Sequence, residues 1–123
     1  MRKPQKILTI LLILWWAYLL FMTHVPHPPY IGPRLTDKSK HMIAYGILGA
    51  LLYINLRIRR RSPAEAVAAT VAIVIAAGAL DEWTQELLPM FGRTAELMDW
   101  SADITGAAVA TVALAGVETI GGK

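Results

Sequence analysis

The sequence predicts an all-α, polytopic membrane protein with four transmembrane helices, on the basis of its composition and of four uncharged stretches. Of its 123 residues, 55% are hydrophobic and only 17% are charged, which is more apolar than a typical globular domain. The uncharged stretches cover residues 7–25, 42–56, 66–80 and 104–117. A chain of this length cannot surround four apolar helices with its own residues, so we expect lipid to surround them.

The first stretch allows a second interpretation, because it is preceded by basic residues as a secretory signal would be. Arg2, Lys3 and Lys6 form this basic region. The residues that follow Met22 are Thr-His-Val-Pro, which contain no small-x-small cleavage pattern. We therefore favour four spans over a signal peptide followed by a small secreted helical domain.

The first predicted helix covers about residues 7–25 and is the only stretch long enough to indicate a span by itself. It ends before the proline cluster at 26–33, because proline cannot continue a helix. Trp15 and Trp16 lie in its middle, so we expect them to pack on neighbouring helices or lipid rather than to mark an interface.

The other three helices are predicted at about 37–56, 64–88 and 99–120. Thr36 or Asp37 can cap the first of these by accepting hydrogen bonds from its free amides. Close helix packing is expected where small residues recur four apart. Such pairs are Gly46 with Ala50 and Gly106 with Ala110.

Basic residues predict the topology, because cationic loops stay in the cytoplasm. With four spans, eight of the twelve lysines and arginines fall on the side of the two termini and four on the other. This favours cytoplasmic termini. The basic run at 57–61 is interpreted as a topological anchor; recruitment of an acidic partner or nucleic acid is the alternative, and we expect no nucleic-acid binding.

Acids and histidines concentrate on the opposite side. On three helices the polar residues recur four apart, which places them on one face. The sets are Asp37, His41 and Tyr45; Asp81 and Gln85; Glu82 and Glu86; and Asp99 and Asp103. Ionisable groups at this depth cost several kcal/mol unless they pair, and by default they mark a site.

We therefore predict a ligand-binding site at this end, and the alternative is a network that only fastens helix ends. The predicted site comprises Asp37, Lys38, His41, Tyr45, Asp81, Glu82, Gln85, Arg93, Asp99 and Asp103. A divalent cation held by oxygen ligands and the His41 imidazole is chemically reasonable there. The sequence identifies neither a metal nor a cofactor.

Other polar residues give weaker support for a functional site. His24 and His27 lie among prolines and are expected to be exposed loop residues. The absence of cysteine excludes disulfides and thiolate sites. No nucleophile motif supports the available hydroxyl groups.

Two segments, "DKSKHMIAYGILG" and "LDEWTQELLPMFGRTAELMDWSADITG", resemble the VanZ-like family of small bacterial membrane proteins. The resemblance implies a single VanZ-like transmembrane domain over 1–123, in the bacterial plasma membrane, and a link to glycopeptide (teicoplanin-type) resistance. The family pattern falls on Asp37, Lys38, His41, Tyr45, Asp81, Glu82, Gln85, Pro89, Arg93, Asp99 and Gly106. Two features depart from it: the interval from Gln85 to Arg93 is longer, and Asp103 stands where asparagine is common. The extra charge at Asp103 calls for a proton, a basic partner or a cation.

Three functions are compatible with these residues. The first is binding of an envelope lipid or a lipid-linked cell-wall precursor, with Lys38 and Arg93 gripping phosphate or carboxylate. The second is an enzyme acting on a lipid-linked substrate, with His41 as general base, Asp37 or Asp81 orienting it, and Arg93 stabilising an anion. The third is a structural subunit that engages an envelope protein.

Overall fold

A computed structural model describes residues 2–24, 35–87 and 97–122, and the helices in these residues confirm the all-α prediction. It contains α1 (Lys3–His24), α2 (Asp37–Ile58), α3 (Pro63–Leu87) and α4 (Leu97–Gly121). Each of the four is long and apolar enough to cross a membrane. The chain is therefore a four-helix, multi-pass membrane protein.

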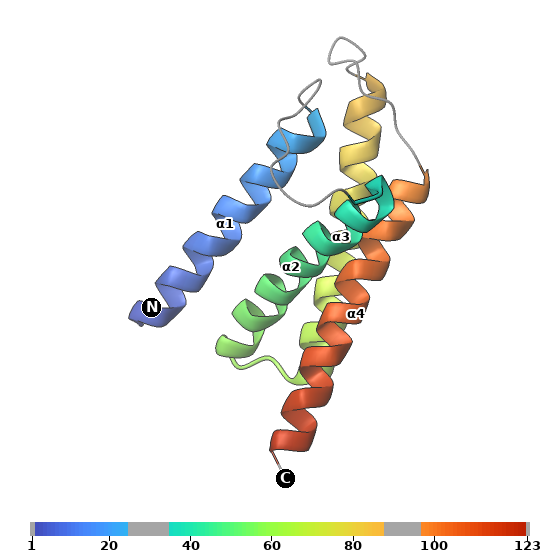
Figure 1. Cartoon of the computed structure of the whole chain (residues 1–123). Helices are drawn as coiled ribbons and strands as arrows, with labels where there is room; N and C mark the ends of the chain where they lie inside the picture. Colours follow the sequence, from blue (N-terminus) through green and yellow to red (C-terminus); the bar gives the residue numbers. More distant parts are fainter. Residues whose placement is uncertain (1, 25–34, 88–96, 123) are drawn as a thin grey trace.

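The helices run alternately up and down, so the first and last described residues lie at the same end of the bundle (Figure 1). We call this the termini end; it also contains the α2–α3 connection. The end of α1, the start of α2, the end of α3 and the start of α4 lie at the opposite end, which we call the polar end.

Local sequence explains where α2 begins and where α3 follows it. The Thr36 hydroxyl accepts a hydrogen bond from the Ser39 amide at 3.2 Å, so Thr36 is the N-cap of α2. After α2, Arg60 adopts a left-handed φ of 66° and turns the chain. Ser62 and Glu65 then form a capping box for α3, each side chain accepting from the other residue's amide, at 2.9 and 3.1 Å.

The core is small and lies mainly between α2, α3 and α4, where Leu48, Val74 and Ala107 are wholly buried. The first helix adds Leu19, which is 4% exposed. Most other large apolar side chains face outward, including Ile13 on α1 and Val117 on α4, which are 61% and 68% exposed. This pattern suits surfaces that contact lipid rather than water.

The first helix packs less closely and is attached by polar contacts. Near its middle, Trp15 donates its Nε1–H to the Ala44 carbonyl of α2 at 2.9 Å, so Trp15 packs on a neighbour as predicted. Nearer the termini end, Thr9 donates to Asn55 at 3.0 Å, and Asn55 donates to the Leu8 carbonyl at 3.2 Å. Such hydrogen bonds join helices in lipid, where the hydrophobic effect does not.

Candidate functional site

The close approach of α2 and α4 at the polar end creates the first part of the site. An added Cβ at Gly106 would lie 2.1 Å from the Met42 carbonyl oxygen, so only glycine permits this contact. Farther along the pair, a Cβ added at Gly49 would lie 2.9 Å from the Ala107 Cα. The predicted close packing at Gly106 is confirmed. It brings His41, next to Met42, against Asp103, which precedes Gly106 by three residues.

Four ionisable side chains meet across this contact. His41 Nδ1 lies 2.6 Å from Asp103 Oδ1, within hydrogen-bond distance. On the other edge of the ring, His41 Nε2 lies 3.6 Å from Asp99 Oδ2. Lys38 donates from Nζ to Asp99 Oδ1 at 2.6 Å. We call Lys38, His41, Asp99 and Asp103 the charge array.

The charge array runs from the interior of the bundle to its surface. The Asp103 side chain is only 1% exposed, whereas those of His41 and Lys38 are 18% and 37% exposed. Tyr45, which is buried, stacks on the His41 ring with a centroid distance of 6.5 Å and an interplanar angle of 6°. With an imidazolium at His41, the array contains two positive and two negative charges and is neutral.

A second polar cluster joins α1 to α3. Asp81 is 4% exposed and accepts a hydrogen bond from the Thr23 hydroxyl at 2.9 Å. His24 lies beside them, with Nδ1 3.3 Å from Asp81 Oδ1 and Nε2 2.8 Å from the Thr84 hydroxyl. The Gln85 amide donates to the Thr23 carbonyl at 3.0 Å. Thus the end of α1 is fixed to the end of α3 by buried hydrogen bonds.

The two clusters adjoin each other where α3 meets α4. An added Cβ at Gly78, one turn before Asp81, would lie 2.6 Å from Trp100 Cδ1 and 3.8 Å from Asp103 Oδ2. Asp81 and Asp103 are close enough to interact electrostatically. Asp81 of α3 and Asp103 of α4 therefore lie in one region, where Gly78 allows the two helices to approach closely.

The structure places the predicted site residues as follows. Lys38, His41, Tyr45, Asp99 and Asp103 are brought together on α2 and α4, and Asp81 and Gln85 meet α1 instead. Glu82 is partly buried and lies within electrostatic range of His41. Arg93, the Pro89 position and the side chain of Asp37 lie outside the described residues.

Two expectations from the sequence are corrected. Of the two acids expected to orient His41, Asp81 instead accepts a hydrogen bond from Thr23 of α1, and the carboxylate within hydrogen-bond distance of His41 is Asp103, which the α2–α4 contact brings beside it. The other expected acid, Asp37, has its side chain outside the described residues and stays a prediction. His24 is the last residue of α1 with its ring against Thr84, and not an exposed loop residue. His27 lies outside the described residues.

Sequence reasoning also missed the roles of Thr23 and Trp100. Trp100 donates to the Ile75 carbonyl at 3.1 Å and packs over Gly78, which ties α4 to α3. A signal for Thr23 and His24 was present in the first predicted helix, which already extended to residue 25 and so contained both of them.

Among the residues that the structure describes, no group of three or more histidine, aspartate or glutamate side chains is arranged to hold a metal ion. The surplus charge at Asp103 is met instead by a basic partner, the His41 ring. Comparisons with models of protein families, with curated proteins and with solved structures gave no match.

Proposed function

We propose that this chain is a VanZ-like protein of the bacterial plasma membrane whose polar end faces outward and binds the head group of an envelope lipid or a lipid-linked cell-wall precursor. The orientation is supported by the arginines of the α2–α3 connection, which lie at the termini end and favour the cytoplasm. In this proposal, the protein is linked to teicoplanin-type resistance because it binds the head group of the cell-wall precursor.

The observation that carries the proposal is the charge array itself. Helix capping needs one side chain at each helix end, whereas the array places four ionisable groups on two adjoining helices. Burying such groups within a membrane span is costly, so they are retained by default for function. The graded exposure, from buried Asp103 to half-exposed Lys38, points the array outward to where head groups lie.

The array also provides a mechanism for accepting an anionic group. A phosphate or carboxylate of the ligand that forms an ion pair with Lys38 displaces the Asp99 carboxylate from this lysine. Asp99 already lies 3.6 Å from His41 Nε2 and so has a cationic partner in an imidazolium. Binding then replaces the ion pair between Lys38 and Asp99 by one between Lys38 and the ligand, while Asp99 keeps its contact with His41. No charge of the array is left without a partner, which is the condition for a low desolvation penalty.

The test uses the purified protein in nanodiscs and a panel of envelope lipids and lipid-linked precursor fragments. We expect Lys38→Gln to weaken binding by at least about tenfold, as loss of a hydrogen bond to a charged group does. Asp99→Asn should strengthen binding, because the ligand no longer competes with a carboxylate for Lys38. Lys40→Gln removes the same charge from the same helix, outside the array, and serves as the matched control. Unchanged binding by well-folded Lys38 and Asp99 variants refutes the proposal.

A second function, an enzyme acting on a lipid-linked substrate, is favoured by the His41–Asp103 contact. A buried carboxylate bonded to Nδ1 fixes the imidazole and leaves Nε2 on the outer side to take a proton as general base. His41→Gln should abolish turnover of an envelope lipid while expression and helicity persist. If the protein converts none of the panel, with or without magnesium or zinc, the binding function stands alone.

A further inference from the structure

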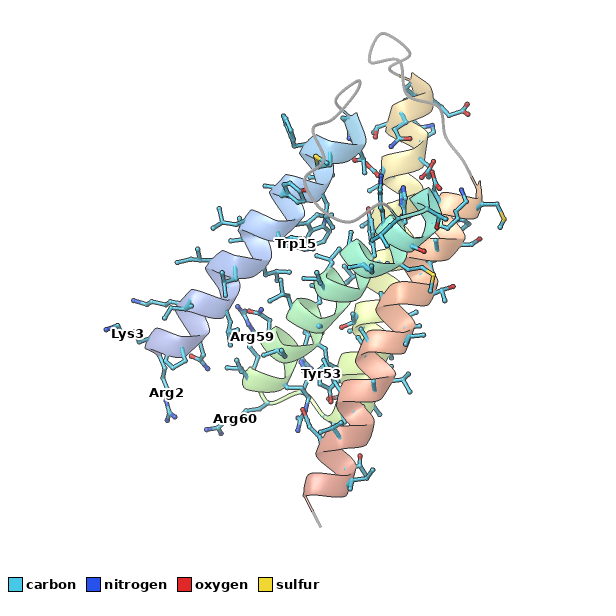
Figure 2. All side chains as sticks on the ribbon, in the orientation of Figure 1. Arg2, Lys3, Trp15, Tyr53, Arg59 and Arg60 are labelled. Carbon is cyan, nitrogen blue, oxygen red and sulfur yellow. The ribbon has the colours of Figure 1, made fainter. Side chains whose placement is uncertain are left out.

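The termini end presents a second concentration of charge, in which exposed basic side chains predominate. Six side chains there are exposed, and within residues 2–24, 35–87 and 97–122 none of them forms an ion pair with a carboxylate. The acids at this end are already engaged, Glu118 with Arg57 and Glu65 with Ser62. The six residues are Arg2, Lys3, Lys6, Arg59, Arg60 and Arg61, and Figure 2 labels four of them.

Three of these cations surround the line along which α1 meets α2, which we call the α1–α2 seam. Arg59, just after α2, reaches across it and donates from Nη2 to the Thr9 hydroxyl of α1 at 3.3 Å. Lys6 precedes Thr9 by three residues, so the two lie on the same face of α1. Arg2 lies just before the first residue of that helix. The seam therefore opens at the termini end between a guanidinium from one helix and two cations from the other.

The same face of α1 becomes apolar toward the middle of the membrane. Ile13 follows Thr9 by four residues and is 61% exposed. Ile10, which is 54% exposed, adds apolar surface on the adjoining face of the helix. A molecule with a phosphate at the seam's opening and acyl chains along these side chains would match both the charge and the apolar surface.

We propose that Arg59, Lys6 and Arg2 bind the phosphate of an anionic phospholipid at the α1–α2 seam. Arginine presents a planar fork of donors that matches phosphate oxygens, and Lys6 adds a compact point charge. Basic clusters beside transmembrane helices bind anionic head groups in this manner. The site is at the opposite end from the charge array and does not depend on the function proposed for it.

The test compares four single-charge removals in the purified full chain. Arg59→Gln and Lys6→Gln act at the seam, whereas Arg60→Gln and Lys3→Gln are matched controls that remove equal charge beside it. Dioctanoyl phosphatidylglycerol is titrated by calorimetry, with dioctanoyl phosphatidylcholine and inorganic phosphate as separate arms. We expect the seam variants to weaken phosphatidylglycerol binding about tenfold or more, and each control by less than about fivefold, the effect of a cation acting through surface potential alone.

Equal losses in all four variants would show diffuse attraction and overturn the proposal. Equal affinity for phosphatidylcholine would overturn it too, and so would equally tight binding of inorganic phosphate. Circular dichroism verifies helicity, because Arg59 also contacts Thr9. If Arg59→Gln does not fold, Lys6→Gln against Lys3→Gln decides the outcome.

Discussion

Replacing Gly106 with alanine tests whether the α2–α4 approach positions the charge array. The new methyl group would lie 2.1 Å from the Met42 carbonyl oxygen and within 2.9 Å of two further Met42 backbone atoms. Backbone atoms cannot rotate away as a side chain does. Ordinary contact needs about 3.5 Å, so the helices must separate by about 1 Å or remain strained.

Either response lowers the free energy of unfolding. Strain from overpacking costs about 1–3 kcal/mol. Separation by about 1 Å stretches the 2.6 Å contact between His41 and Asp103 beyond the roughly 3.2 Å limit of a hydrogen bond. Losing a hydrogen bond to a charged group costs about 1.5–3 kcal/mol. We therefore expect Gly106→Ala to destabilise the protein by about 1–3 kcal/mol.

Gly116→Ala is the matched control, because it lies on the same helix and its added Cβ meets nothing within 4 Å. It should be neutral or more stable by up to about 1 kcal/mol, the helix-propensity gain of alanine over glycine. Unfolding of both variants is measured by circular dichroism during titration with sodium dodecyl sulfate. Equal stability of the two variants would refute the assignment of the close contact and of its role.

The remaining predictions concern the hydrogen bonds that join the helices. A double-mutant cycle with His41→Gln and Asp103→Asn should give a coupling of about 1–3 kcal/mol in the same titration, and additivity would contradict their contact. Asp81→Ala removes the interhelical acceptor of the Thr23 hydroxyl, which keeps only partners within its own helix, such as the Leu20 carbonyl. The loss of this hydrogen bond to a charged group should cost about 1–3 kcal/mol, with α1 becoming more accessible to proteolysis. Trp15→Phe removes one interhelical hydrogen bond and replaces the indole by a smaller aromatic ring, so a loss of at least about 0.6–1.7 kcal/mol is expected; an unchanged stability would contradict the contact with α2.

The four helices could be predicted because uncharged stretches, prolines and capping residues indicate locally where a membrane-spanning helix begins and ends. The first helix nevertheless begins at Lys3 rather than near residue 7. Lysine is a good helix former, so the absence of charge marks the lipid-facing part of a helix and not its full length. Similarly, α2 continues through Arg57 to Ile58 before the turn at Arg60 ends it.

The pairing within the site could not be predicted from spacing alone. Four-residue spacing places Asp99 and Asp103 on one face of α4, but the rotation of α4 against α2 decides which carboxylate meets His41. The contact between Gly106 and Met42 sets that rotation. In the same way, spacing within α3 does not reveal that α1 lies beside Asp81. The Thr23 hydroxyl of α1 donates a hydrogen bond to Asp81 Oδ1.

The orientation of the polar end in the membrane is the most direct test of the proposed function, and the absence of cysteine from the chain makes it accessible. Single variants Glu86→Cys and Arg60→Cys place one thiol on an exposed residue at each end of the bundle. A membrane-impermeant maleimide applied to intact cells should label the thiol at position 86, and should label that at position 60 only after permeabilisation. Labelling of position 60 but not position 86 in intact cells would contradict an outward-facing head-group site.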